Sequence, residues 1–188
     1  SDPDQNDRHS YLVDDPRFEV KNGQLKLVDG QTLNYEEASK VAVTVTTIDA
    51  GFLSHEQQFV ITVTDANDLP FSSNDAVTIS EDAVTLLKVD DFGDFIDEDG
   101  TQLASVRITE LPTKGMLQFF DGTAWQSVAV NQVISRTDIV AGKLQFVPAA
   151  DENGADYAKV GFQVGDGAGF SNQSYTLTVN VTPVNDAP

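Results

Sequence analysis

The stretch Ile-Thr-Val-Thr-Asp-Ala-Asn-Asp-Leu-Pro at residues 61–70 decides how this chain of 188 residues is organised. It begins as a strand of alternating apolar and polar residues, continues into an acidic segment and stops at a proline. A similar stretch, Val-Asn-Val-Thr-Pro-Val-Asn-Asp-Ala-Pro, closes the chain at residues 179–188. The two Asn-Asp pairs are about 118 residues apart, which is the length of a whole domain. The repeat therefore predicts two tandem domains joined by acidic linkers, at residues 1–69 and 70–188.

The charge of the chain limits its possible functions. Thirty Asp and Glu residues against eleven Lys and Arg residues give a formal net charge of −19. This balance argues against nucleic-acid binding, because too few cations are present to neutralise phosphates. Carboxylate oxygens are hard ligands that suit Ca²⁺, so bound calcium is one expectation. The alternative is an acidic surface that serves only solubility or adaptation to salt.

The chain contains no cysteine, no apolar run of membrane length and no signal peptide. A secreted domain without disulfides is more typical of bacterial surface repeats than of eukaryotic extracellular domains. We therefore interpret the sequence as a piece of a longer extracellular protein, at the cell surface or secreted, with no membrane insertion.

Turn residues divide the sequence into short strand-like runs. Asn22-Gly23 predicts a hairpin between the runs at 18–20 and 24–28, and β-branched residues at 41–48 and an alternating run at 59–63 predict two further strands. No amphipathic helix is expected, and the fold class is all-β, with two Greek-key β-sandwiches. The strands expected in the second domain lie at 77–79, 84–89, 103–109, 115–120, 125–130, 143–147, 157–164 and 174–182.

The two predicted domains differ at their beginnings. The Asp97/Asp99 pair follows two expected strands, whereas the comparable Asp2/Asp4 pair opens the chain. We therefore expect the first domain to lack its N-terminal strands in this sequence, through truncation or because another chain supplies them. A sandwich with open edges favours strand exchange or pairing, so homophilic adhesion through this edge is one hypothesis.

The acids recur as spaced pairs at strand ends. Residues i and i+2 of an extended segment face the same side, and two carboxylates placed there repel each other unless a cation bridges them. Calcium takes six to eight oxygens, which include the backbone carbonyls that turns supply. A single Asp-Gly or Asn-Gly pair is more simply an ordinary turn. The spaced polar residues are Asp2/Asp4, Asn34/Glu36, Asp49, Asp65/Asn67/Asp68, Glu81, Asp97/Asp99, Asp151/Asn153 and Asp166.

Four motifs of the first domain follow one another in a known order. They are Asp2-Pro3-Asp4, Leu33-Asn34-Tyr35-Glu36, Asp49-Ala50-Gly51 and Asp65-Ala66-Asn67-Asp68. In these motifs the chain resembles tandem cadherin-like repeats. The second domain is similar to the divergent cadherin-like repeats of very large bacterial surface adhesins. That similarity rests on residues 95–100, 111–115, 142–148, 151–154 and 184–188.

The resemblance implies Ca²⁺ ions between successive domains. At the middle junction it implies ligands from three parts, namely Glu36 with Asn34, the linker residues Asp65, Asn67 and Asp68, and then Asp97, Asp99 and Asp166. It further implies an upstream half-site of Asp2, Asp4 and Asp49 and a downstream one of Glu81, Asp151, Glu152 and Asp186. Asn34, Leu69 and Pro183 depart from the family pattern, so one to three ions are expected at the middle junction.

The function implied is that of a calcium-stabilised adhesin repeat, a rigid rod segment in cell–cell or cell–surface adhesion and in biofilms. Its partners would be neighbouring repeats of the same polypeptide. No catalytic residues are predicted, since Ser54, His55 and Glu56 are adjacent and cannot form a triad. His9 and His55 are far apart in sequence and have no cysteine beside them, which does not indicate zinc.

The alternative function is a carbohydrate-binding module for an exopolysaccharide or a host glycan. Stacking on a sugar would need exposed aromatic side chains. The candidates are Trp125, Tyr157 and Phe170.

Overall fold

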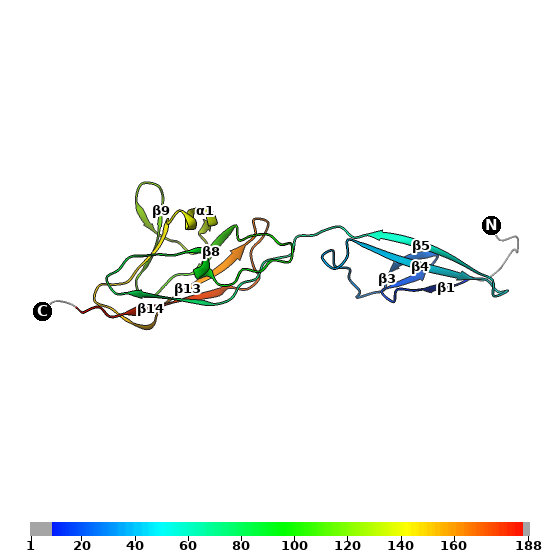
Figure 1. Cartoon of the computed structure of the whole chain (residues 1–188), viewed down its shortest axis with the longest axis horizontal. Coiled ribbons are helices and arrows are strands. Elements are labelled where there is room, and N and C mark those ends of the chain that lie inside the picture. The colour runs from blue at the N-terminus through cyan, green and yellow to red at the C-terminus, as the bar shows by residue number, and fades with distance from the viewer. Residues whose placement is uncertain (1–8, 186–188) are drawn as a thin grey trace. The chain divides into compact units, whose positions relative to one another are not determined.

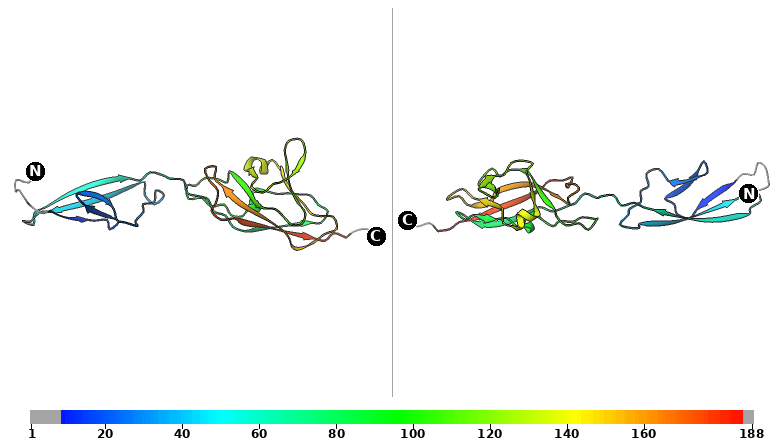
Figure 2. Two further views of the ribbon diagram at one scale, coloured as in Figure 1. Left: turned by 180° about the vertical axis from the view of Figure 1, so that it is seen from behind. Right: turned by 90° about the horizontal axis from the view of Figure 1, so that it is seen from above.

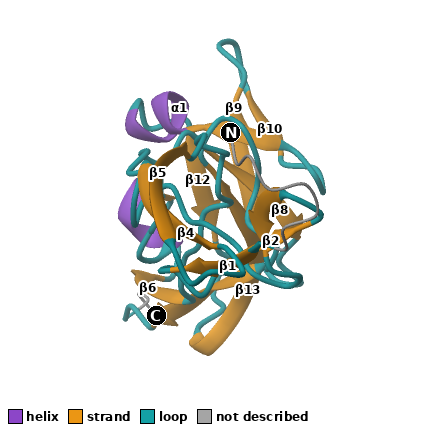
Figure 3. Ribbon diagram, turned by 90° about the vertical axis from the view of Figure 1, so that its right-hand side faces the viewer, coloured by secondary structure: helices purple, strands orange, loops and turns teal. Residues whose placement is uncertain are grey.

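The computed structural model describes residues 9–185, so the predictions for Asp2, Asp4 and Asp186 lie outside the described residues. Contacts divide the chain into two compact units, Ser1–Ala66 and Asn67–Pro188, whereas the sequence placed the boundary after Leu69. Strands and loops make up nearly all of the described chain, as the orange and teal ribbon of Figure 3 shows. The all-β prediction is confirmed.

Unit 1 consists of a three-stranded antiparallel sheet and a hairpin (Figure 1). The sheet has the order β1-β4-β5, with β1 at Ser10–Val13, β4 at Lys40–Ile48 and β5 at Ser54–Thr62. The hairpin pairs β2 at Phe18–Lys21 with β3 at Gln24–Leu27. Strand β1 was not predicted, because its surroundings are polar and it is only four residues long.

The hairpin of unit 1 forms where Asn22-Gly23 predicted it. Both residues have a positive φ, 55° and 74°, which is the conformation of the tight turn that matches strand twist. The hairpin buries Phe18 against Val41 and Val43 of β4. This small core holds the hairpin on one face of the sheet.

Unit 2 is built from two sheets. One has the order β10-β9-β12-β7 and the other the order β11-β8-β13-β14-β6. Strand β6 runs parallel to β14, while the other pairs are antiparallel. The orange and red ribbons of β13 and β14 lie side by side in both views of Figure 2. The bounds are β6 Asp75–Ser80, β7 Thr85–Leu86, β8 Ser105–Glu110, β9 Met116–Phe120, β10 Trp125–Ser127, β11 Val133–Ser135, β12 Leu144–Val147, β13 Gly154–Gly165 and β14 Tyr175–Thr182.

The core of unit 2 is centred on β13, the middle strand of its sheet. Phe162 is fully buried, with its ring edge-on to Phe92 at 5.2 Å and tilted against Tyr175 at 5.8 Å between ring centroids. Phe146 and Tyr157 form a second edge-to-face pair at 6.4 Å. Such pairs add to the free energy that the burial of their area already supplies.

Two short helical segments depart from the predicted strand pattern. The run at 84–89 was expected to be one strand, but it forms β7 and then a 3₁₀-helix η1 at Val89–Phe92. Helix α1 at Arg136–Val140 begins at Ser135, whose hydroxyl accepts a hydrogen bond from the Asp138 N–H at 3.0 Å. Five residues are too few to show helical periodicity in the sequence. None of the helices in residues 9–185 has the length and apolar character needed to cross a membrane.

Candidate metal centre

In unit 1 a capped turn places Glu36 near the end of β5. The Asn34 side-chain oxygen accepts hydrogen bonds from the N–H groups of Glu36 at 2.7 Å and Glu37 at 3.4 Å. This turn brings a Glu36 carboxylate oxygen within 4.8 Å of one from Asp65, which follows β5. The structure thus brings two predicted residues together and gives Asn34 the role of holding the turn.

In unit 2 the segment after Ala66 is attached to the loop that carries Asp97 and Asp99. The Asp68 N–H donates to Asp99 Oδ2 at 2.9 Å. Asp97 Oδ1 accepts from the Thr101 N–H at 3.2 Å. The remaining oxygens, Asp97 Oδ2 and Asp99 Oδ1, are buried and have no hydrogen-bond partner among the described residues.

Asp166 provides the next part of the same region of unit 2. Its Oδ1 accepts from the N–H groups of Ala168 at 2.7 Å and Gly169 at 2.6 Å. Its Oδ2 accepts from the Asn67 side-chain amide at 3.1 Å, and that amide also donates to the Asp68 carbonyl at 3.0 Å. Asn67 and Asp68 are therefore connected to both predicted acidic loops of unit 2.

The environment keeps Asp166 ionised. Burial raises the pKa of its carboxyl, but the hydrogen bonds from Gly169, Asn67 and Ala168 together outweigh that effect, so the pKa lies below its ordinary value. A carboxylate accepts hydrogen bonds at about four lone-pair positions, so Asp166 retains capacity to bind a cation.

Apolar contacts hold this segment in place beyond the acidic residues. Leu69 packs against Gly169, where a Cβ would collide with Leu69 Cδ2. Phe71 then forms a two-way backbone bridge with Ile96, with hydrogen bonds of 2.8 and 3.0 Å. Leu69 thus stands where the cadherin pattern has a polar residue and acts as an apolar anchor.

The donor set of unit 2 fits a hard cation. Buried carboxylate oxygens without a partner cost free energy, and a bound cation would remove that cost. The set consists of carboxylate, amide and carbonyl oxygens, which favours Ca²⁺ over softer metals. Asp97 and Asp99, with Asn67 and Asp68, are the residues that would hold it. Asp166 is bound to Asn67 by a hydrogen bond, but among the described residues Asp97, Asp99 and Asp166 do not bring three ligand atoms within 4.8 Å of one another.

The other end of the unit 1 sheet carries Asp49. It lies in the β4–β5 turn, where its Oδ1 accepts from the Leu53 N–H at 2.8 Å. Asp49 lines a cavity of about 220 Å³ together with His9 and His55. The two histidines are far apart in sequence, and the antiparallel pairing of β1 with β4 and of β4 with β5 brings them to the same cavity. Among the described residues, these three side chains do not bring three ligand atoms within 4.8 Å of one another.

The residues predicted for the downstream half-site lie where the parallel strands β6 and β14 end, at Ser80 and Thr182. Glu81 is 4% exposed and accepts hydrogen bonds from the Asn153 side chain at 2.8 Å and the Val184 N–H at 2.6 Å. The Asp151 N–H donates to Asp82 Oδ1 at 3.2 Å, and Glu152 pairs with Lys114 at 3.2 Å. Glu81 therefore fastens the chain that leaves β14.

Glu81 should make the stability of unit 2 dependent on acid pH. The hydrogen bonds from Asn153 and Val184 lower the pKa of Glu81 below its ordinary 4.5. A lowered folded-state pKa stabilises the fold above the unfolded-state value, and this stabilisation is lost as pH falls through the folded-state value. We expect the melting temperature to fall more steeply below pH 4.5 in the parent chain than in Glu81→Gln. Identical slopes in thermal melts of the two proteins from pH 6 to pH 2 would contradict this assignment.

The aromatic side chains of the carbohydrate alternative are only partly available. Tyr157 is 6% exposed, its hydroxyl accepts the Ala149 N–H at 3.0 Å, and Lys114 lies over its ring. The Phe170 ring carries the Arg107 guanidinium at 4.3 Å from its centroid. Trp125 is 37% exposed and packs against Phe120 at 5.5 Å. Of the three candidates only Trp125 offers an exposed ring.

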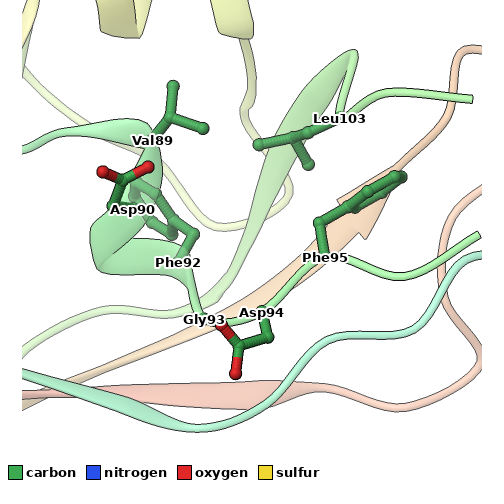
Figure 4. Close-up of a pocket in the computed structure, with 7 residues that line it drawn as sticks. All are labelled: Val89, Asp90, Phe92, Gly93, Asp94, Phe95 and Leu103. Carbon is green, nitrogen blue, oxygen red and sulfur yellow. The ribbon is translucent and has the colours of Figure 1, made fainter.

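A cavity of about 290 Å³ lies beside η1 in unit 2. Figure 4 shows Val89, Leu103 and Phe95 around it, with the carboxylates of Asp90 and Asp94 directed away from the Phe95 ring. Its two acids therefore do not converge on a common point inside the cavity.

The comparison with protein-family models shows the family of the chain. Residues 56–181, well over half of the sequence, match the family model described as SibA-like, immunoglobulin-like domain. The chain belongs to the SibA-like, immunoglobulin-like domain family. A comparison of the SibA-like chain with curated proteins found no match.

Solved structures of cadherin repeats share the fold of the SibA-like chain. Human protocadherin-24 EC1-2, form II, is 19% identical with a TM-score of 0.59, and the match covers 97% of this chain and 84% of that one. Protocadherin gamma B2 domains 3–6 are 17% identical with a TM-score of 0.51, over 93% of this chain and 41% of that one. At these identities the likeness shows the fold alone, and it confirms the predicted tandem cadherin-like architecture.

Proposed function

We propose that the SibA-like chain is a calcium-stabilised repeat unit of an extracellular adhesin and serves as a rigid rod segment. The observation that carries the proposal is the pair of buried oxygens of Asp97 and Asp99, which have no hydrogen-bond partner in the described chain. They lie in the loop to which Asp68 is bound. The preceding residue, Asn67, is bound to Asp166, whose carboxyl is held ionised. A divalent cation is the simplest partner for such oxygens.

The proposed mechanism is mechanical. Without calcium, the carboxylates of the linker and of the Asp97–Asp99 loop repel one another and the linker is a tether. With calcium, fixed oxygens of the loop hold Asn67 and Asp68. In unit 1, Asp65 lies two residues before Asn67 in the chain, and its carboxylate is close to that of Glu36. The linker then loses conformational freedom, and the rod becomes stiffer and more resistant to proteases.

The partners and the location of the chain follow from this role. The partners are neighbouring repeats of the same polypeptide, and the location is the cell surface or the extracellular medium. We extend the proposal to a bacterial surface adhesin that acts in biofilms. No catalysis is involved. A calcium affinity in the range of extracellular modules, roughly 10⁻⁴–10⁻³ M, would keep such a site filled outside the cell.

A calcium titration of the whole chain tests the proposal. We expect Ca²⁺ to raise the melting temperature and to slow cleavage between residues 64 and 69, and Mg²⁺ at equal concentration to do so less, because Mg²⁺ gives up its waters reluctantly. As a control, Asp94→Asn removes one negative charge close to Asp97 and Asp99 in the chain but outside the proposed site. This variant should keep the full rise in melting temperature with calcium. A melting temperature and a cleavage rate that do not change with calcium would refute the proposal.

A further inference from the structure

The cavity of about 290 Å³ beside η1 in unit 2 is not part of the proposed calcium site. Its apolar walls come from four side chains, Val89, Phe92, Phe95 and Leu103 (Figure 4). Phe92 and Leu103 are buried, whereas Val89 and Phe95 are half-buried and remain accessible to solvent. The volume is close to the lower end of the range for small-ligand sites, about 300–1,000 Å³. The cavity therefore suits a small group with an apolar body.

Hydrogen bonds fix the segment that forms one wall of this cavity. The Ser72 hydroxyl donates to the Phe92 carbonyl at 2.7 Å, and the Asp94 N–H donates to Ser73 Oγ at 3.1 Å. Between these two contacts, Gly93 has a φ of 74°, and a Cβ there would collide with the Ser73 carbonyl oxygen. The wall is therefore formed before any ligand arrives, which lowers the ordering cost of binding.

The polar side chains at this cavity are acidic. Asp90 and Asp94 line it and are exposed, and among its described lining residues there is no Lys or Arg. Asp91 lies between them in the chain, but its Oδ2 accepts from the Lys88 N–H at 2.7 Å. In a chain of net charge −19, the field at such a rim favours a cation. The cavity thus combines apolar walls with two carboxylates that are open to an organic cation.

Lys114 shows how unit 2 already binds an alkylammonium group. Its Nζ lies 5.3 Å from the centroid of the Tyr157 ring and 3.2 Å from Glu152 Oε2. An aromatic ring and a carboxylate together hold this cation. Phe95 and Asp94 line the cavity beside η1 with the same two chemical groups, but without a lysine in the lining.

The two acids of the cavity lie too far apart in direction to share one ion. In Figure 4 the carboxylates of Asp90 and Asp94 leave the chain at two places and point away from the Phe95 ring. Neither acid belongs to a group of three acids with ligand atoms within 4.8 Å of one another in the described chain, which does not indicate a metal ion. A ligand with one cationic group at each end of an apolar chain matches this layout.

We propose that the cavity beside η1 binds a short aliphatic diamine. The hydrocarbon chain lies against Val89, Phe95 and Leu103, where it is removed from water. One ammonium group meets Asp90 and the other meets Asp94. Aliphatic amines resemble the lysine side chain and are charged at neutral pH. Because both ion pairs are exposed, each strengthens binding only modestly, by about two- to fivefold. The site uses none of the residues proposed to hold calcium.

A titration of the whole chain with cadaverine, followed by amide chemical shifts in NMR spectra at saturating calcium, tests this inference. We expect saturable shift changes at Val89, Phe95 and Leu103, with a dissociation constant of the order of millimolar for so small a ligand. Pentylamine has the same chain length and one ammonium group, so it should bind about two- to fivefold more weakly. Equal affinities of the two amines, or shift changes that spread over the acidic surface without saturation, would overturn the inference.

Variants of the two acids test the contacts of each end. Asp90→Asn and Asp94→Asn should each weaken cadaverine binding about two- to fivefold and change pentylamine binding less. Glu110→Gln removes an exposed acid at the end of β8, outside the cavity, and should leave both affinities unchanged. Unchanged cadaverine binding in both aspartate variants would overturn the inference. Since Asp94→Asn should keep its response to calcium, failure of the diamine site and failure of the calcium site can be told apart.

Discussion

Replacing both Asp97 and Asp99 with asparagine is expected to abolish the stabilisation of the chain by calcium. At a calcium concentration 100 times the dissociation constant, a single site adds about 2.7 kcal/mol to the free energy of unfolding. For a unit of this size that corresponds to roughly 10 °C in melting temperature. Asparagine keeps the shape of each side chain, and its amide oxygen can still accept the Asp68 N–H at position 99.

Without calcium, the two asparagine substitutions should no longer lower the stability of the chain. With a chelator present, the double variant should be as stable as the parent chain or more stable, because two neighbouring negative charges have been removed. Thermal melts of both proteins, with calcium and with a chelator, measure the difference. If the double variant still gained the full stabilisation from calcium, or were destabilised equally in both conditions, these carboxylates would not be calcium ligands.

Phe162→Ala is expected to destabilise unit 2 by about 3–5 kcal/mol, since a fully buried ring on the central strand would leave a cavity. The ring contacts Phe92 edge-on and also Tyr175, so both aromatic pairs would be lost. The melting temperature should drop by about 10–20 °C. Val133→Ala, at a half-exposed site in the same sheet, should change the free energy of unfolding by less than about 1 kcal/mol. Similar losses in the two variants would show that the core is not organised around Phe162.

Local features of this fold could be predicted from the sequence. Asn22 and Gly23 demand a tight turn wherever they occur between two strands, and the structure has that turn. Alternating residues at 59–63 likewise predicted part of β5. The sequence could not predict that β6 runs parallel to β14, because this pairing joins residues about 100 positions apart and depends on how the whole unit folds. The sequence also could not predict that the run at 84–89 ends as a strand at Leu86 and continues into the 3₁₀-helix at Val89, because a short apolar run suits a strand or a helix.

The acidic residues of the candidate centre could be named from the sequence, but their roles could not. The spacing of Asp97 and Asp99 and the resemblance to cadherin-like repeats singled out these two residues and Asp166, and the structure connects Asp99 and Asp166 to the segment at Asn67 and Asp68. Whether an Asp oxygen bonds a backbone N–H or remains without a partner depends on loop geometry. Asn34, which the resemblance predicts as a ligand, has a side-chain oxygen that accepts hydrogen bonds within a turn. Tyr157 was considered as an exposed ring, yet it lies in the core.

The position of bound calcium in a crystal is the sharpest test of the proposed site at Asp97 and Asp99. Crystals of the chain grown with calcium should show, in anomalous difference maps, a peak within 2.3–2.6 Å of Asp97 Oδ2 and Asp99 Oδ1, the distance at which Ca²⁺ binds oxygen. We predict that peak, with Asp166, Asn67 or Asp68 among the remaining ligands. The absence of a peak at these two oxygens at saturating calcium, or a peak held only by acids elsewhere in the chain, would contradict it.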